Sequence, residues 1–178
     1  MSEPLAEAFL ENVRFEFARM KKLCEGAITQ LGDEQLSLSP AKDSNSVSVL
    51  MRHMAGNMLS RWTDFLSSDG EKPWRDRDAE FEDAEMTREE LLAYWEKGWS
   101  VFLETLHSLQ PSDLQRNVTI RGESLTVLQA ILRQTNHYSY HTGQLVYVAR
   151  YFSGERWKSL SIPKGRSQEF NQGTYLKP

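Results

Sequence analysis

Two histidines, His137 and His141, lie four residues apart in the segment NHYSYHTGQ. Four residues make about one turn of an α-helix, so both imidazoles leave the same helix face about 6 Å apart along the axis. Two neutral imidazoles at this spacing can bind one divalent metal ion through bonds of about 2.0–2.1 Å. A pair does not complete a metal site, so the rest of the chain must supply a third ligand.

His53 is the candidate third ligand, in the segment LMRHMAGNML. A helical projection places it with Asn57 on a small polar face beside an apolar stripe. The same projection places His137 and His141 among core residues, with no carboxylate on their face. Because both ring nitrogens of a buried imidazole need partners, a metal ion would satisfy the accepting nitrogens. The residues alone also allow an alternative, in which these are core histidines satisfied by hydrogen bonds.

His107, the remaining histidine, lies near the predicted C-terminus of a helix, just before LQPSDL. A histidine is favourable there because it faces the negative end of the helix dipole. We therefore interpret His107 as structural or exposed.

Apolar residues recur at three- and four-residue steps in four long segments, as on one face of an α-helix. The predicted helices run to about residue 32, from 46 through 65, from 87 to about 110, and from 126 to about 152. The last three begin with capping signals: Ser46, the pair Thr87 and Glu90, and the pair Thr126 and Gln129. Four long amphipathic helices predict an all-α fold, and specifically a four-helix bundle.

Three stretches depart from the helical pattern. Residues 118–126 alternate around Gly122 and Glu123, which predicts a short β-hairpin before the fourth helix. The polar stretch of about residues 67–86 is too long for a minimal connection, and we expect Trp74 and Phe81 to hold it in order against the helices. The tail of about residues 153–178 has no helical stripe. The prediction is a single domain over residues 1–178.

Composition limits the classes of function. The chain of 178 residues is 39% hydrophobic and 26% charged, which is typical of a globular protein. Its single cysteine, Cys24, excludes an internal disulfide and lies at a helical core position, where an inert thiol is expected. A net charge of −4 without a basic stripe argues against nucleic-acid binding. Without a signal-peptide pattern or a membrane-length apolar run, we expect a cytoplasmic protein with no membrane partner.

The histidine pattern, with one histidine on the second helix and HxxxHxGQ on the fourth, resembles the DinB/YfiT-like superfamily of metal-dependent enzymes. The resemblance covers nearly the whole chain. Further segments that carry it are SVSVLMRHMAGN, GEKPWRDRDAEF, WEKGW and WKSLSIPKGRSQEFN. These are similar to a bacterial subgroup of that superfamily with no assigned substrate.

The resemblance implies that His53, His137 and His141 together hold one divalent metal ion, most often zinc or nickel. It also implies a homodimer. Characterised relatives in the superfamily include transferases and isomerases that use low-molecular-weight thiols such as bacillithiol or mycothiol. The resemblance therefore favours a thiol as cosubstrate, although no thiol-recognition motif is visible in this chain.

Three protein ligands leave at least one metal position for water or substrate. We expect a metal-dependent S-transferase that joins a thiol to a small electrophile. One alternative is a metal-dependent hydrolase, in which the metal lowers the pKa of a bound water. The other is a non-catalytic, stress-related bundle that the metal stabilises.

Four polar residues near the histidines have two interpretations each. Asn57 and Gln144 can orient a bound water or substrate, or they can satisfy buried polar groups. Arg75 and Arg77 can meet an anionic substrate, or they can pair with the acidic residues beside them. We expect the structural role in both cases.

Overall fold

The computed structural model describes residues 2–82 and 84–170. The protein is mostly helical, as predicted, with one small antiparallel hairpin. In chain order the elements are α1 (Glu3–Ile28), α2 (Asp33–Leu36), α3 (Val47–Trp62), the 3₁₀ turn η1 (Ala79–Phe81), α4 (Arg88–Ser108), η2 (Pro111–Gln115), β1 (Asn117–Ile120), β2 (Glu123–Thr126), α5 (Val127–Ser153), η3 (Gly154–Arg156) and α6 (Ser167–Phe170). None of the helices in these two ranges is long and apolar enough to cross a membrane.

The three predicted helix starts are confirmed. The Ser46 hydroxyl accepts a backbone N–H from the first turn of α3. Thr87 with Glu90, and Thr126 with Gln129, each form a capping box at the start of α4 and α5. In a capping box, two backbone donors that the helix leaves free are satisfied reciprocally by side chains, which defines where the helix begins.

The first long helix ends earlier than predicted. α1 stops at Ile28, and Gly32 instead precedes the short α2. The guanidinium of Arg88, at the start of α4, donates to the carbonyls of Ile28 and Leu31, both at 3.1 Å. The last carbonyls of a helix have no partner within it, and Arg88 satisfies that of Ile28, the last residue of α1.

The hairpin is present, but its turn lies one residue earlier than predicted. β1 pairs antiparallel with β2, and Ile120 lies opposite Glu123. The turn residues are therefore Arg121 and Gly122, with φ angles of 56° and 76°. Two-residue hairpin turns favour this left-handed backbone because its twist matches that of the strands, and glycine adopts it without strain.

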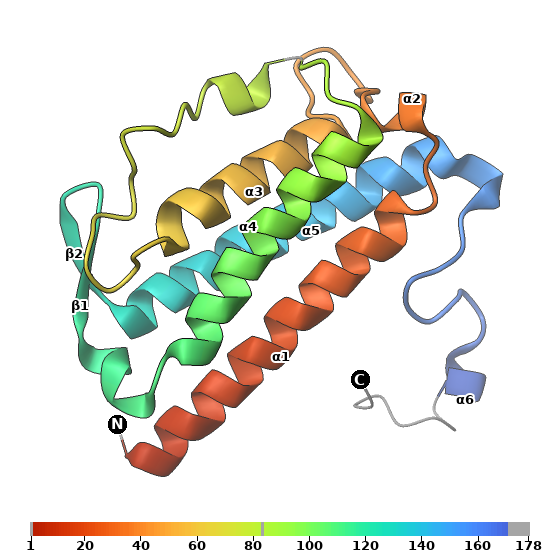
Figure 1. Cartoon of the computed structure of the whole chain (residues 1–178). Helices are drawn as coiled ribbons and strands as arrows, with labels where there is room; N and C mark the ends of the chain where they lie inside the picture. The colour runs from red at the N-terminus through yellow and green to blue at the C-terminus, as the bar shows by residue number, and fades with distance from the viewer. Residues whose placement is uncertain (1, 83, 171–178) are drawn as a thin grey trace.

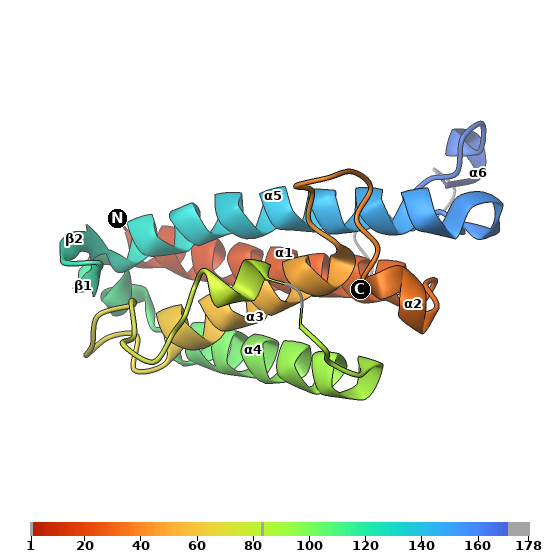
Figure 2. The ribbon, with the colours of Figure 1, turned by 90° about the horizontal axis from the view of Figure 1, so that it is seen from above.

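Four long helices, α1, α3, α4 and α5, lie side by side in the part of the chain that the structure describes (Figures 1 and 2). Each packs against two of the others, in the cyclic order α1, α5, α3, α4. Aromatic side chains from all four meet in the core, where Phe102 lies 4.6 Å from Phe17, 4.6 Å from Trp62 and 5.3 Å from Tyr138 between ring centroids. Offset and edge-to-face contacts of this kind add to the burial of apolar surface.

Cys24 of α1 is part of this core. Its Sγ lies 3.5 Å from the Thr142 hydroxyl of α5, and the side chain is fully buried. Burial raises the pKa of the thiol to about 12. The thiol is therefore protonated at neutral pH, which confirms the prediction of an inert core cysteine.

α3 and α4 are neighbours that run parallel. Ala55 lies against Gly98, and further along both helices the Thr105 hydroxyl donates to the carbonyl of Trp62 at 3.0 Å. Parallel neighbours cannot be joined by a short turn, so the chain returns along their length through residues 63–87 (Figure 1). This return explains why the connection is long.

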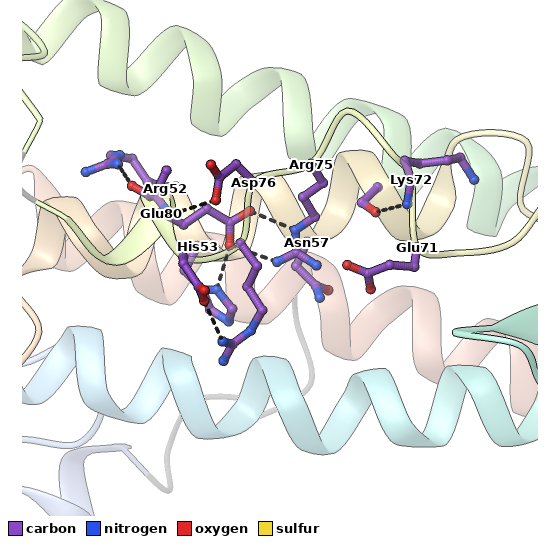
Figure 3. A network of polar contacts seen from close by, with 12 residues as sticks. Arg52, His53, Asn57, Glu71, Lys72, Arg75, Asp76 and Glu80 are labelled. Atoms are coloured by element: carbon purple, nitrogen blue, oxygen red, sulfur yellow. Dashed lines mark hydrogen bonds and ion pairs between the residues drawn. The ribbon is translucent and has the colours of Figure 1, made fainter.

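Polar contacts hold the returning connection against α3. Arg52 of α3 donates to two backbone carbonyls of the connection (Figure 3). Phe81 is half-buried, and its ring centroid lies 4.6 Å from that of His53. Trp74 is 58% exposed, so the prediction that it packs against the helices is wrong. The backbone of the connection finds its partners on α3, and the tryptophan is not needed for its order.

Asp69 joins the same connection to the hairpin. Its carboxylate accepts the backbone N–H groups of Glu71 at 2.7 Å, Arg121 at 2.9 Å and Gly122 at 2.8 Å. These backbone donors, Glu71 first, hold the pKa of Asp69 below its usual value. The connection and the hairpin are therefore tied together near the start of α5.

The tail after α5 folds back along α1. Lys158 and Gln30 exchange two hydrogen bonds, at 2.6 Å and 3.0 Å. The side chain of Leu160 covers Gly26, where a Cβ would lie 2.9 Å from it. The tail predicted as irregular thus contains η3 and α6, and its segment around Lys158 and Leu160 lies against α1, while residues 171–178 fall outside the described part of the chain.

Replacing Asp69 by alanine should lower the free energy of unfolding by about 1–3 kcal/mol, because three backbone donors lose a charged acceptor. Urea denaturation of wild type and variant measures the change. Asp78→Ala, in the same connection, is the control, since Asp78 is exposed and approaches Arg77 only at 3.6 Å. Equal stability of the two variants would contradict the structural role of Asp69.

Candidate metal centre

Three imidazoles meet between α3 and α5. Nε2 of His137 lies 3.2 Å from Nε2 of His53 and 3.1 Å from Nε2 of His141. One ring nitrogen from each of the three residues lies within 4.8 Å of the other two. The structure therefore brings together the three histidines that the sequence singles out.

The antiparallel packing of α3 and α5 produces this meeting. His53 faces His137 and His141, whereas Asn57, one turn later on α3, accepts a hydrogen bond at 2.9 Å from Gln134, earlier on α5. His53 is 3% and His141 7% exposed, and His137 is half-buried. All three imidazoles project from helix interiors, so rigid elements hold them in place.

Two of the three separations between the imidazole nitrogens fit one tetrahedral metal ion. Ligand atoms about 2.0–2.1 Å from a tetrahedral metal lie about 3.3 Å from one another. The two separations from Nε2 of His137, 3.2 Å and 3.1 Å, agree with that edge length, and the third pair, His53 and His141, lies within 4.8 Å. Among the residues that the structure describes, no other histidine, cysteine or carboxylate joins the group. A bound ion would therefore keep a position for an external ligand.

Glu80 is the partner of the outer nitrogen of His53 (Figure 3). Nδ1–H of His53 donates to Glu80 Oε2 at 2.9 Å, and Arg75 donates to both carboxylate oxygens at 2.7 Å and 2.8 Å. The helix face of His137 and His141 has no carboxylate, as expected, and Glu80 reaches His53 from the returning connection instead. A carboxylate on Nδ1 selects the tautomer whose Nε2 is free to bind a metal.

Gly56 makes room for this carboxylate. A Cβ at Gly56 would lie only 2.1 Å from Glu80 Oε1 and 2.9 Å from its Cδ. Burial alone raises the pKa of the Glu80 carboxyl, but the hydrogen bonds from His53 and Arg75 outweigh it, so the pKa lies below its usual value. Glu80 is therefore ionised at neutral pH even though it is buried.

His141 has a partner on its own helix. Its Nδ1–H donates to Gln144 Oε1 at 2.8 Å, and the Gln144 amide in turn donates to the Tyr140 hydroxyl at 3.1 Å. This arrangement also leaves Nε2 as the free nitrogen of His141. Of the two interpretations of Gln144, the structure supports the satisfaction of a histidine nitrogen.

Asn57 likewise satisfies buried polar groups. Its Oδ1 accepts from Gln134 at 2.9 Å and from the Tyr138 hydroxyl at 3.2 Å. The Gln134 amide nitrogen also lies 3.0 Å from Nδ1 of His137. For His137 to bind a metal through Nε2, its Nδ1 must carry the proton, so Gln134 would turn its amide oxygen towards that proton. If the side-chain amide of Asn57 flipped as well, its nitrogen would donate to the Gln134 oxygen, so the hydrogen bond between Asn57 and Gln134 would be kept.

Two of the histidines are poised to be neutral. Burial, together with the neighbouring His141 and His53, lowers the pKa of His137 to about 3. Burial and then His53 lower the pKa of His141 to about 4, against an opposing effect of the Gln144 hydrogen bond. Neutral imidazoles are the form that binds metal ions, so protons do not compete at neutral pH.

A cavity of about 360 Å³ opens beside the three imidazoles. This volume lies within the range of small-molecule sites. Besides the histidines, the lining residues are Asn57, Arg61, Arg75, Arg77, Phe81, Arg121, Arg133, Gln134 and Tyr140. The lining is polar, and its charged members are all arginines.

Three of the residues around the site were not expected from the sequence. Arg61 and Arg133 continue the spacing of four residues on the histidine faces of α3 and α5, and this spacing is a signal that could have identified them. No spacing pattern identifies Glu80 as a site residue, because it is one of several acidic residues in a polar connection. His107 is exposed and bonds the Leu103 carbonyl on its own helix, as predicted for a residue outside the site.

Replacing Glu80 by glutamine should weaken metal binding by about 10- to 100-fold, the usual cost of losing the partner of a histidine ligand. Gly56→Ala should have a similar effect, because the new methyl group displaces the Glu80 carboxylate. Competition titration with a chromophoric chelator measures the affinity. Glu82→Gln, an exposed acid in the same connection, is the matched control. Unchanged affinity in both test variants would show that Glu80 does not support the metal ligands.

The metal-free protein should lose stability as the pH falls from about 6.5 towards 4. In that range the unfolded chain binds protons at residues 137 and 141, while the folded protein, with pKa values of about 3 and 4, does not. The slope is about 1.4 kcal/mol per pH unit for each histidine. Urea melts with chelator present measure it, and His137→Gln should have a smaller slope. The same slope in that variant would refute the assignment.

Comparison with known proteins assigns the chain to a family without a described activity. The sequence profile of a family described as "Protein of unknown function (DUF1572)" matches residues 4–166. The match includes α1 through η3, and with them all three histidines and Glu80. No curated protein matches the chain. Because the profile covers most of its length, the chain belongs to the DUF1572 family.

Proposed function

We propose that this protein is a divalent-metal-dependent enzyme that joins a low-molecular-weight thiol to a small electrophile. His53, His137 and His141 are the proposed metal ligands, and zinc or nickel is the proposed ion. The observation that carries the proposal is the convergence of three imidazole nitrogens beside a cavity, with no fourth protein ligand among the described residues. This is the ligand arrangement of catalytic rather than structural metal sites.

His53, His137 and His141 would hold a divalent ion, which would supply the positive charge that favours the thiolate form of a thiol at neutral pH. The residues of the chain prepare the site for that ion. Glu80 and Gln144 keep the protons of His53 and His141 on Nδ1, away from the centre. Tyr140 lines the cavity with a hydroxyl that accepts from Gln144 and keeps its own proton to donate. The arginines of the lining favour anionic ligands at the open position.

The choice of a thiol over water rests on the resemblance to the DinB/YfiT-like superfamily. Hydrolysis is the second candidate, and the polar lining of the cavity favours it, because water enters such a cavity readily. Both reactions use the same three histidines. The identity of the nucleophile is what separates them.

The finer features of the fold belong to the same proposal. We propose a four-helix bundle of the DinB/YfiT-like type, which the cyclic packing of α1, α5, α3 and α4 supports.

We also propose a homodimer that forms through α5. Leu132, Tyr147 and Tyr151 are large exposed side chains that lie within about 100° of one another around this helix. The proposed location is the cytoplasm, and the proposed partners include neither nucleic acid nor membrane.

The test measures metal content and thiol conjugation in the same preparations. Wild type should bind about one divalent ion per chain and accelerate the reaction of a low-molecular-weight thiol with an aryl halide such as chlorodinitrobenzene. His137→Ala should lose both the ion and the catalysed rate, because two imidazoles no longer hold the ion. His107→Ala is the matched control and should keep both.

Each outcome separates the candidates. Full activity in His137→Ala would overturn the metal-dependent mechanism. Ester or amide hydrolysis without thiol, lost in the same variant, would identify the hydrolase. A bound ion whose removal lowers the melting temperature, without either reaction, would indicate the non-catalytic bundle.

A further inference from the structure

Five arginines line the cavity beside the histidines, and two of them have no acidic partner. The three paired arginines are Arg75 with Glu80, Arg77 with Asp78, and Arg121 with Glu71. Arg61 and Arg133 make no ion pair with any residue that the structure describes, and no carboxylate lines the cavity. The cavity wall therefore carries two positive charges that the described protein groups leave unneutralised.

Arg61 is also deeply buried. It is 5% exposed, and its Nη1 has no hydrogen-bond partner in the described part of the chain. Burial, and then the charge of Arg133, lower the pKa of its guanidinium. Glu71 is the acidic residue that acts on Arg61 electrostatically, but its carboxylate is bonded to Arg121 at 2.9 Å. A buried charge without a partner is costly, so proteins keep one where a ligand completes it.

The backbone around Arg61 provides space for its side chain. A Cβ at Gly70 would lie 2.8 Å from Cδ and 3.2 Å from Nη1 of Arg61. Ser60 holds this piece of backbone in place, because its hydroxyl donates to the Gly70 carbonyl at 3.0 Å and accepts from the Lys72 N–H at 3.1 Å. Nη1 of Arg61 therefore lies on the Gly70 side of the guanidinium, and Arg61 also lines the cavity.

The helix register places the two unpaired arginines on the same side of the metal centre. Arg61 lies two turns after His53 on α3, about 12 Å along the axis. Arg133 lies one turn before His137 on α5, about 6 Å along the axis. Because α3 and α5 are antiparallel, both steps lead in the same direction, towards the hairpin. Two cationic side chains from facing helices can then bind one anion between them.

We propose that Arg61 and Arg133 bind the oxyanion of a small ligand, a carboxylate or a phosphate, in the cavity next to the three histidines. The remainder of that ligand extends towards the histidines, and this part of the proposal rests on the proposed function. The oxyanion site itself needs no metal. It can therefore be tested separately.

The test is calorimetric titration of chelator-treated full-length protein with inorganic phosphate and, in a second arm, with succinate. Wild type should bind at least one of the two with saturation at millimolar concentrations. Arg61→Gln should weaken that binding about tenfold or more, or about 1.4 kcal/mol, because a charged hydrogen-bond donor is lost. Arg133→Gln should weaken it severalfold. Arg150→Gln, an exposed arginine on the same helix α5, should not change it.

Two further measurements distinguish this proposal from the metal site and from misfolding. Chelator-treated wild type should bind the anion although it holds no metal ion, which separates the oxyanion site from the metal site. Arg61→Met should remain folded, with a melting temperature equal to or above that of wild type, since it removes an unpaired buried charge. Absence of saturable binding of both anions, or equal binding by wild type and Arg61→Gln, would overturn the oxyanion site. A lower melting temperature for Arg61→Met would also overturn it, because a structural arginine behaves in that way.

Discussion

The parallel orientation of α3 and α4 is the constraint on which the site depends. Two neighbouring helices that point the same way require the chain to travel back along their length before the second can start (Figure 1). That return passes over His53, places Glu80 on its Nδ1 and carries Arg75 and Arg77 to the cavity. A short turn between antiparallel helices would leave His53 without its carboxylate partner. The long connection thus serves both the topology and the chemistry.

The electrostatic balance of the site follows from burial. His137 and His141 are buried enough to be neutral, which suits metal binding. Glu80 is buried but stays ionised, because Arg75 and His53 use both of its oxygens. Around these groups the lining contains arginines and no carboxylate. The site combines neutral ligands, one compensated carboxylate and an excess of positive charge, and such a cavity attracts anions.

Local signals allowed much of the fold to be predicted. Capping residues placed the starts of α3, α4 and α5, because a cap satisfies backbone donors within a few residues. Errors arose where a distant residue decided the outcome. Arg88 satisfies the carbonyl of Ile28, where α1 ends, and that of Leu31 beyond it. Trp74 is exposed, and hydrogen bonds from Arg52 hold the connection against α3. No local pattern contains either contact.

The sequence by itself determined the helical pattern and the histidine pair His137 and His141, since their four-residue spacing has meaning within one helix. It left His53 as a candidate third member of the group. Only the tertiary structure decided what surrounds them. The antiparallel register of α3 and α5 set the distances between the Nε2 atoms, and the return of the chain selected Glu80 from several acids in the same stretch. The spacing of residues in the sequence reports on one helix or strand at a time. Contacts between elements depend on packing and direction, which are properties of the whole fold.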